Sequence, residues 1–277
     1  MLTDTHCHLD SDAFDSDRRA VIERALEAGV GRILIPGVTA ESSRRAVCLA
    51  ANYPVIFAAV GIHPTDLQEG LTDRTIADLR DLAQHPKVVA VGEIGLDYYW
   101  VTEPDAQMRQ REALRAQLEL ARDLPKPVIV HTRERDDAEH GPCAEDLISI
   151  LEEWVGQLRA AHEPLSSPGV LHSFSGSLET AKKAIDLGFY IGVTGPVTYK
   201  NAESRRRVIA ALPLEHLLIE TDAPYLAPHP YRGKRNEPAY VAHIADKIAR
   251  IQSRTPQEVI AVTGNNAARL FSWGETD

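Results

Sequence analysis

The sequence predicts an α/β fold, a single-domain (β/α)8 TIM barrel that spans residues 1–277. Three observations support this prediction. Eight short β-rich runs alternate with amphipathic helical stretches, the order that surrounds a parallel sheet with helices. The length of 277 residues lies within the range that α/β barrels occupy as one domain. No internal repeat, low-complexity segment, Gly/Ser linker or GxGxxG or Walker motif is present, although an open doubly wound sheet stays the alternative.

Taken in order, each expected strand is followed by an expected helix. The first half gives strand 2–8 and helix 15–28, strand 32–37 and helix 41–51, strand 55–61 and helix 73–84, and strand 88–94 and helix 105–122. The second half gives strand 127–132 and helix 144–161, strand 169–174 and helix 177–187, strand 189–194 and helix 203–211, and strand 216–222 followed by helices 238–253 and 256–271. Most helices begin with a capping residue or an acidic first turn. The stretch 135–169 is polar or loop-like on both sides of its helix, which predicts an enlarged connection after the fifth strand.

The composition is that of a globular protein. Charged residues make up 25% of the chain and apolar residues 44%. No apolar run approaches the roughly 18 to 20 residues that a membrane span needs, and no signal-peptide pattern stands at the start. We therefore expect a cytoplasmic protein without membrane contact, and a monomer is our working expectation.

Cysteine usage and net charge argue against several protein classes. The chain has 3 cysteines and no CxxC pair, which disfavours both a disulfide framework and a zinc ribbon. In an extended strand Cys7 points away from its neighbours His6 and His8, which indicates a packing role. The net charge of −10 disfavours a non-specific DNA-coating protein, because any phosphate binding then needs a local positive patch and a bound metal.

Residue types that bind metals lie at the ends of the expected strands. His6 and His8 share one face of the first strand, roughly 7 Å apart along it. The full set, at the carboxyl ends of the first, fourth, fifth, sixth and eighth strands, is His6, His8, Glu93, His131, His172 and Asp222. Barrel enzymes carry their active sites on this face. Any one of these residues alone fits a packed histidine or a capping carboxylate, but six at equivalent positions predict a metal site.

Four histidines and two carboxylates exceed the ligands of one tetrahedral zinc. We therefore predict two divalent cations that share one carboxylate, with Glu93 as the bridge. Such a pair binds both the attacking and the leaving oxygen of a displacement and lowers the pKa of a bound water. Zn²⁺, Mn²⁺ and Mg²⁺ are all compatible with these ligands. The predicted reaction class is hydrolysis.

The chain resembles the TatD-related metal-dependent deoxyribonucleases within the amidohydrolase-like barrels, over nearly its whole length. The matching segments are DTHCHLD at 4–10, GIHP at 61–64, GEIGLDYY at 92–99, VHTR at 130–133, HSFSG at 172–176, ETDAPYL at 220–226 and RGKRNEP at 232–238. The resemblance implies that one metal is held by His6, His8, Glu93 and Asp222, and the second by Glu93, His131 and His172. It also implies that Asp222 orients or deprotonates the attacking water, because a carboxylate has one oxygen for the metal and one for the water.

Further residues are candidates for contacts with the ligands or the substrate. By the resemblance, His63 fits a position beside the metal ligands or a phosphate contact. Glu220 lies two residues before Asp222, faces the same side and is suited to orient a ligand histidine or a substrate-binding side chain, with a salt bridge inside the barrel as the alternative. Asp97 and Tyr98 at the barrel mouth are expected to orient a ligand or stack on a base.

A basic turn follows the eighth strand directly. Arg232, Lys234 and Arg235 form a local positive patch that suits a phosphodiester backbone, although a solvated turn is the common alternative. Arg133, two residues after His131, is expected to add a phosphate or carboxylate contact.

The chain departs from the common family pattern at three places. Ser173 stands where the family often has Cys, and Thr65 stands where His is frequent. The segment 135–169 is longer than expected, which suits a lid or an interface. Because neither Ser173 nor Thr65 is an expected ligand, the departures affect substrate contacts rather than metal binding.

The leading hypothesis is a divalent-metal-dependent deoxyribonuclease that acts as a 3′–5′ exonuclease on single-stranded or frayed DNA, as the resemblance implies. RNA is an open alternative substrate, because nothing in the sequence reads or rejects a 2′-hydroxyl. A second hypothesis is an amidohydrolase-type enzyme for a small lactone, cyclic amide or phosphotriester, because the same binuclear face supports that chemistry. A third is a non-catalytic metal-binding or partner-binding protein.

Overall fold

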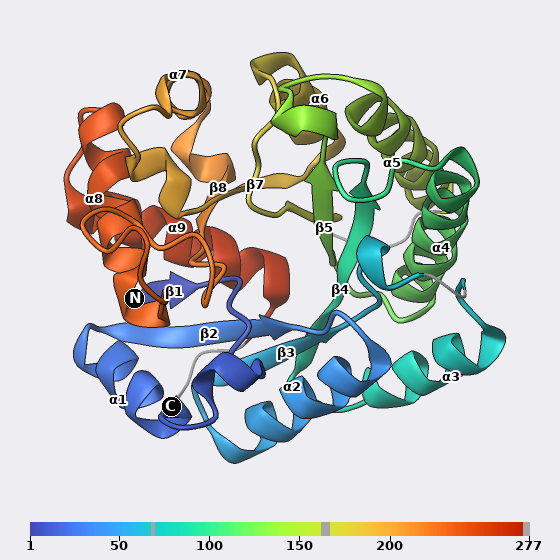
Figure 1. The fold of residues 1–277 in the computed structure, drawn as a ribbon, viewed down its shortest axis with the longest axis horizontal. Helices are drawn as coiled ribbons and strands as arrows, with labels where there is room; N and C mark the ends of the chain where they lie inside the picture. The colour runs from blue at the N-terminus through green and yellow to red at the C-terminus, as the bar shows by residue number, and fades with distance from the viewer. Residues whose placement is uncertain (68–69, 162–166, 274–277) are drawn as a thin grey trace.

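Eight parallel strands form one sheet in chain order, β1 to β8 (Figure 1). The computed structural model describes residues 1–67, 70–161 and 167–273. The strands are β1 (Leu2–Asp4), β2 (Val30–Pro36), β3 (Ile56–Val60), β4 (Val88–Asp97), β5 (Val128–Arg133), β6 (Gly169–Leu171), β7 (Tyr190–Val193) and β8 (Leu217–Ile219). Each strand pairs in parallel with the next along the chain.

The first and last strands meet and nearly close the barrel. The backbone N–H of Thr5 donates to the carbonyl of Ile219 at 3.2 Å, and the N–H of Asp222 donates to the carbonyl of His6 at 2.8 Å. A parallel bridge joins Cys7 to Ala223 just beyond the strand ends. The predicted single-domain (β/α)8 barrel is therefore confirmed, and the open sheet is excluded.

Helices follow the strands and surround the sheet (Figure 1). They are α1 (Arg18–Glu27), α2 (Ala40–Asn52), α3 (Asp73–Leu82), α4 (Pro104–Asp123), α5 (Pro142–Ala160), α6 (Leu178–Leu187), α7 (Glu203–Ala211), α8 (Val241–Ile251) and α9 (Pro256–Phe271). Side chains of Thr39, Thr72, Ser177 and Thr255 cap helix N-termini, which agrees with the general expectation of capping residues at the helix starts. In the described part of the chain, no helix combines the length and apolar character that membrane crossing requires.

Alternate residues of each strand pack into two apolar layers. Ile33 and Ile35 in β2 join the larger cluster under the helices, while Leu34 between them joins a second cluster. That second cluster contains Phe57, Ala90, Ile129, Val170 and Leu218 from other strands and Leu270, Phe271 and Trp273 from the end of the chain. The strand period of two places it inside the barrel. Helix α9 packs across β1 and β8, so the interior is filled with apolar side chains at one end.

Several element bounds differ from the predicted ones. Strand β1 ends at Asp4 instead of residue 8, and β4 extends to Asp97 instead of residue 94. A short 3-10 helix, Asp12–Phe14, precedes α1, which therefore begins at Arg18. The predicted long connection after β5 consists of the 3-10 turn Arg135–Asp137 and α5, and its residues 162–166 lie outside the described residues.

Candidate metal centre

The candidate ligands project into the barrel because they continue its inner face. Ile129 in β5, Val170 in β6 and Leu218 in β8 all belong to the inner apolar cluster. The residues two positions further along the chain are His131, His172 and Glu220. Since strand side chains alternate, these three side chains face the barrel axis above the apolar layer. The polar site is thus the carboxyl-end continuation of the core, as barrel enzymes have it.

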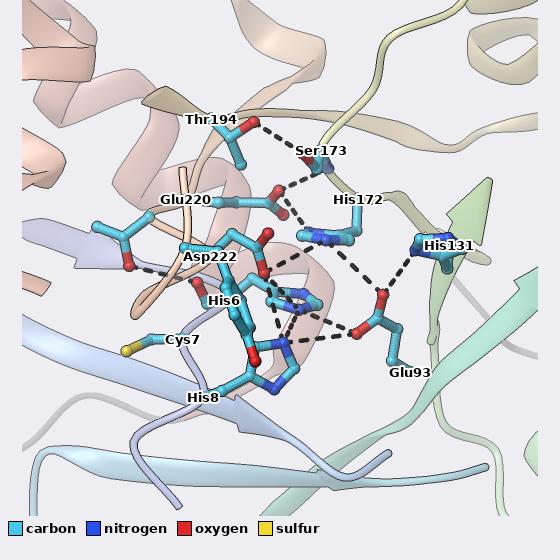
Figure 2. A network of polar contacts seen from close by, with 12 residues as sticks. His6, Cys7, His8, Glu93, His131, His172, Ser173, Thr194, Glu220 and Asp222 are labelled. Atoms are coloured by element: carbon cyan, nitrogen blue, oxygen red, sulfur yellow. Dashed lines mark hydrogen bonds and ion pairs between the residues drawn. The ribbon is translucent and has the colours of Figure 1, made fainter. Parts of the chain in front are cut away.

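Four predicted ligands converge around one point (Figure 2). The Nε2 atoms of His6 and His8 lie 3.2 Å apart. His6 Nε2 lies 3.2 Å from Glu93 Oε2, and His8 Nε2 lies 3.4 Å from Asp222 Oδ1. The structure therefore brings together His6, His8, Glu93 and Asp222, the set expected for one cation.

The second oxygen of Glu93 faces a different group of histidines. Glu93 Oε1 lies 3.0 Å from His131 Nδ1, 3.7 Å from His172 Nε2 and 3.5 Å from His63 Nε2. Imidazoles thus face both oxygens of one carboxylate, and His172 also forms a ligand-competent triplet with His6 and Glu93. His63 belongs to a ligand-competent triplet with Glu93 and His131, whose ligand atoms lie within 4.8 Å of one another. His63 was expected beside the ligands rather than among them, and its role stays a prediction, since this geometry would also suit a ligand.

A β-bulge directs Glu93 inward. The β4–β5 register shifts between Val91 and Ile94, so two residues of β4 face one residue of β5 at this point. The backbone N–H of Glu93 donates to the carbonyl of Gly37 at the end of β2, at 2.8 Å. Bulges of this kind re-aim side chains near active sites. Glu93 therefore points inward from within the strand, which continues for four residues beyond it.

Two further buried carboxylates contact the candidate ligands His172 and His131 on the ring nitrogens that face away from Glu93 and the other candidate ligands. Glu220 Oε2 lies 3.0 Å from His172 Nδ1 and accepts from the backbone N–H of Ser173 at 2.9 Å. A Cβ at Gly192 in β7 would lie 2.2 Å from this oxygen, so the glycine makes room for it. Asp97 Oδ2 lies 3.0 Å from His131 Nε2, and its Oδ1 accepts from the backbone N–H of Trp100 at 2.8 Å. Such carboxylates fix the tautomer and orientation of metal-binding imidazoles.

Replacing Glu220 with Gln is expected to lower metal affinity or turnover by about 10- to 100-fold. The substituted amide keeps the volume of the side chain but loses the charge that stabilises the proton on His172 Nδ1. Metal titration of the purified protein measures the effect. Glu215→Gln, an exposed glutamate on the approach to β8, is the matched control, and equal affinity in both variants would contradict this role of Glu220.

The electrostatics of the site suit cations. Burial opposes ionisation of Glu93, but electrostatic interactions with the imidazoles of His6, His63 and His172 outweigh it and hold the pKa of Glu93 well below its usual value. Burial likewise opposes the charge of Asp222, and the hydrogen bond from His8 with the neighbouring imidazoles lowers its pKa. Burial, with the nearby His172, lowers the pKa of His6, which favours the neutral imidazole that a metal binds. Imidazole nitrogens facing two ionised carboxylates form a donor set that fits divalent cations.

Metal binding is expected to release protons and to strengthen as pH rises toward 9. Burial opposes the charges of His8 and His131, but hydrogen bonds to Asp222, Asp97 and Glu93 outweigh it and raise the pKa of each histidine to about 9. In the metal-free protein these protons stabilise the fold fully below pH 6.5, and that contribution is lost as pH rises through about 9. A cation competes for the same nitrogens.

Calorimetric metal titration at pH 7.5 in two buffers of different ionisation enthalpy measures this release. The observed binding enthalpy should differ between the buffers in proportion to the protons released. Buffer-independent enthalpies would show that the histidines are already unprotonated and would contradict the expectation.

Asp4, the last residue of β1, was missed as a site residue although it precedes His6 by two positions. Its carboxylate accepts from the backbone N–H of Thr221 at 2.8 Å and from the Thr221 hydroxyl at 2.5 Å. It also accepts from the backbone N–H of His6 at 3.3 Å. Asp4 therefore ties the His6 segment to the segment that carries Asp222, whose backbone has a φ of +57°. Left-handed backbone at a non-glycine residue is often found at functional sites.

The predicted substrate residues fall into two groups. A cavity of about 950 Å³ opens above the centre, and Arg133 and His63 line it. Tyr98 was expected to face the substrate, but its ring is buried and its hydroxyl donates to Asp146 in α5 at 2.6 Å. That expectation was wrong because β4 continues to Asp97 and turns the next side chain outward, toward the helices.

The basic turn lies outside the cavity lining. Arg235 pairs with Asp17 at 2.6 Å, so it links the turn to the start of α1. Lys234 is exposed. Arg232 is exposed and stacks over the Tyr199 ring at 4.4 Å, and Tyr199 itself lines the cavity. Of the three basic residues, Arg232 is the one with a ring contact to a residue of the cavity lining.

Several cavity residues were not singled out by the sequence analysis, and three of them are suited to contact a ligand. Trp100 and Tyr225 line the cavity and keep 66% and 61% of their surface exposed, which leaves two aromatic faces for a ligand. Arg205 in α7 also lines it. Trp100 and Tyr225 stood within or beside the quoted motifs, whereas Arg205 lies in a run of three arginines that reads as an ordinary solvated helix face.

Comparisons with known proteins agree on one family. Residues 3–272 match the family model described as TatD related DNase. The uncharacterized metal-dependent hydrolase YabD of Bacillus subtilis is 40% identical over 98% of this chain and 99% of its own length. A protein of Erwinia tasmaniensis named 3′-5′ ssDNA/RNA exonuclease TatD is 37% identical over 97% of this chain and 99% of its own length. The crystal structure of YjjV, a TatD homologue from Escherichia coli K12, has a TM-score of 0.84 and 36% identity, covering 98% of each chain.

Proposed function

Because the chain belongs to the TatD related DNase family and is thus a metal-dependent hydrolase, we propose that it is a deoxyribonuclease that removes nucleotides from the 3′ end of single-stranded DNA. The proposal includes two divalent cations per chain. One observation carries it: the two oxygens of Glu93 face two different histidine sets, with Asp222 beside the first. Two cations in this arrangement would polarise a phosphodiester and make water more acidic.

The chain's own residues supply the binding and the proton transfer. His6 and His8 would bind one cation, His131 and His172 the other, and Glu93 both. Asp222, whose lowered pKa keeps it ionised at neutral pH, would accept the proton of the attacking water. Its side chain is 15% exposed and lines the cavity, so water and substrate reach it.

The cavity suits a single strand better than a duplex. Its rim presents Trp100 and Tyr225, and exposed aromatic faces of this kind stack on unpaired bases, each worth roughly 1–3 kcal/mol. The Erwinia tasmaniensis relative is named a 3′-5′ exonuclease for single-stranded DNA and RNA. Its name supports cleavage from the 3′ end and leaves RNA as a second substrate. We also propose that the enzyme is cytoplasmic and monomeric. Light scattering on the purified protein tests the monomeric state.

A substrate comparison tests the proposal. The kcat/KM for a single-stranded oligonucleotide is expected to exceed that for a lactone, a cyclic amide and a phosphotriester by orders of magnitude, because the exposed rings of Trp100 and Tyr225 at the cavity suit unpaired bases. Preference for one of the small molecules would favour an amidohydrolase-type enzyme. Metal binding without turnover of any substrate would favour the non-catalytic alternative.

A further inference from the structure

The two sides of the cavity mouth differ in charge. On the side of β1 to β3 the lining includes Asp10, Asp12 and Asp66, with Arg45 paired to Asp10 at 3.4 Å. The other side, formed by the segments after β5 and β7, is lined by two arginines, Arg133 and Arg205, and one carboxylate, Asp137. A phosphate chain is repelled by the first side and attracted by the second.

Arg205 is the least compensated charge on the basic side. Its guanidinium is half-buried in the cavity wall and donates to the carbonyl of Phe174 at 3.4 Å. Within the described residues, no carboxylate lies at ion-pair distance from it. Burial lowers the pKa of Arg205, and the more distant charges of Asp137 and Glu139 offset this only in part. A half-buried arginine of this kind is suited to an anionic ligand.

Two other arginines lie near Arg205. Arg133, whose charge acts on Arg205, lies over the Tyr99 ring at 3.7 Å and pairs with Asp137 at 2.8 Å. Arg232 stacks over the ring of Tyr199, on which the charge of Arg205 also acts. We call Arg133, Arg205 and Arg232 the arginine arc. Arg133 and Arg205 line the cavity, and Arg232 is connected to it through the Tyr199 ring. Aromatic rings thus flank the guanidinium planes of Arg133 and Arg232.

We propose that the arginine arc, centred on Arg205, binds the phosphates of the nucleic-acid strand that continues away from the scissile bond. This inference rests on the proposed nuclease function and adds to it the path of the substrate. The strand lies over the β5 to β8 side, and the aspartates on the β1 to β3 side disfavour any continuation of the strand there. An enzyme with one attractive and one repulsive side acts at a strand end, so the charge arrangement gives a physical reason for exonuclease action.

The test compares Arg205→Gln with Arg207→Gln, an exposed arginine on the same helix. Both variants and the wild type are assayed on oligothymidylates and on bis(p-nitrophenyl) phosphate, which is too small to reach the arc. Arg205→Gln is expected to raise KM for the oligonucleotide about tenfold, with little change in kcat and with the small diester unaffected. Arg207→Gln should behave as the wild type.

Fluorescence anisotropy supplies a readout that does not depend on turnover. Binding of an oligothymidylate with phosphorothioate linkages at its 3′ end is measured between 50 and 200 mM salt. Loss of one phosphate contact should reduce the slope of log affinity against log salt by about 0.7 in Arg205→Gln only.

Three outcomes would contradict the proposal that the arginine arc binds substrate phosphates. They are an unchanged KM and salt slope in Arg205→Gln, equal changes in Arg207→Gln, or an equal loss of activity on the small diester. Absence of DNA cleavage by the wild type would count against the proposed function alone, and the anisotropy comparison would still decide whether the arc binds a phosphate chain.

Discussion

Replacing Asp222 with Asn is expected to lower kcat for DNA hydrolysis by about 10²- to 10⁴-fold while the fold stays intact. The amide keeps the shape of the side chain and can still accept a hydrogen bond. It has no basic oxygen, however, and cannot take a proton from water at neutral pH. In the wild type, His8 and the other imidazoles lower the pKa of Asp222, so that its carboxylate is ionised and can accept a proton. Single-turnover cleavage of an oligonucleotide measures the loss.

Asp12→Asn is the matched control for this variant. Asp12 lines the same cavity and is exposed, so its replacement removes an equal charge from the mouth without touching the centre. It should cleave DNA at the wild-type rate or slightly faster. Circular dichroism establishes that both variants are folded. Wild-type turnover by Asp222→Asn would remove the proton-transfer role from the mechanism.

Replacing Glu93 with Gln is expected to reduce bound metal from two ions per chain to one or none, and to abolish turnover. Glu93 is the residue whose two oxygens face both histidine sets. An amide offers one neutral oxygen and cannot bridge two cations. The metal content after dialysis, measured by inductively coupled plasma mass spectrometry, gives the stoichiometry directly.

The metal-free form of Glu93→Gln should also unfold at a lower temperature than the metal-free wild type. Glu93 is ionised and buried among imidazoles, and removing one partner of a buried charge network costs about 3–5 kcal/mol. Asp66→Asn, an exposed carboxylate at the same cavity, serves as the control for both measurements. Two ions per chain in Glu93→Gln would contradict the bridge.

The fold and the gathering of the candidate ligands were predictable because both follow from short-range patterns. Eight strands alternating with helices leave few topologies. Strand periodicity placed Glu220 on the same side as the ligands, and it kept Cys7 in the core, where the structure buries it fully. Every residue predicted to bind metal lies at the carboxyl face, and their role as ligands stays a prediction that the metal titrations address.

The remaining features depend on contacts that local patterns do not encode. The bulge that aims Glu93 inward is a register shift between β4 and β5, visible only once the strands are paired. The same extension of β4 turns Tyr98 outward and leaves Trp100 exposed at the mouth. Arg235 looked available for phosphate, but its partner Asp17 is more than two hundred residues away in the chain. Arg205 is a candidate phosphate contact because its side chain is half-buried in the cavity wall, and the sequence of α7 does not reveal this burial.

The most direct measurement strips the protein of metal with a chelator, reloads it separately with Mg²⁺, Mn²⁺ or Zn²⁺, and follows a 5′-labelled single-stranded DNA on a sequencing gel. A ladder that shortens from the 3′ end, that needs metal and that is absent with Asp222→Asn, is the predicted result, and the most active cation identifies the metal preference. Intact DNA with every metal, or cleavage that persists without one, would contradict a metal-dependent 3′–5′ exonuclease.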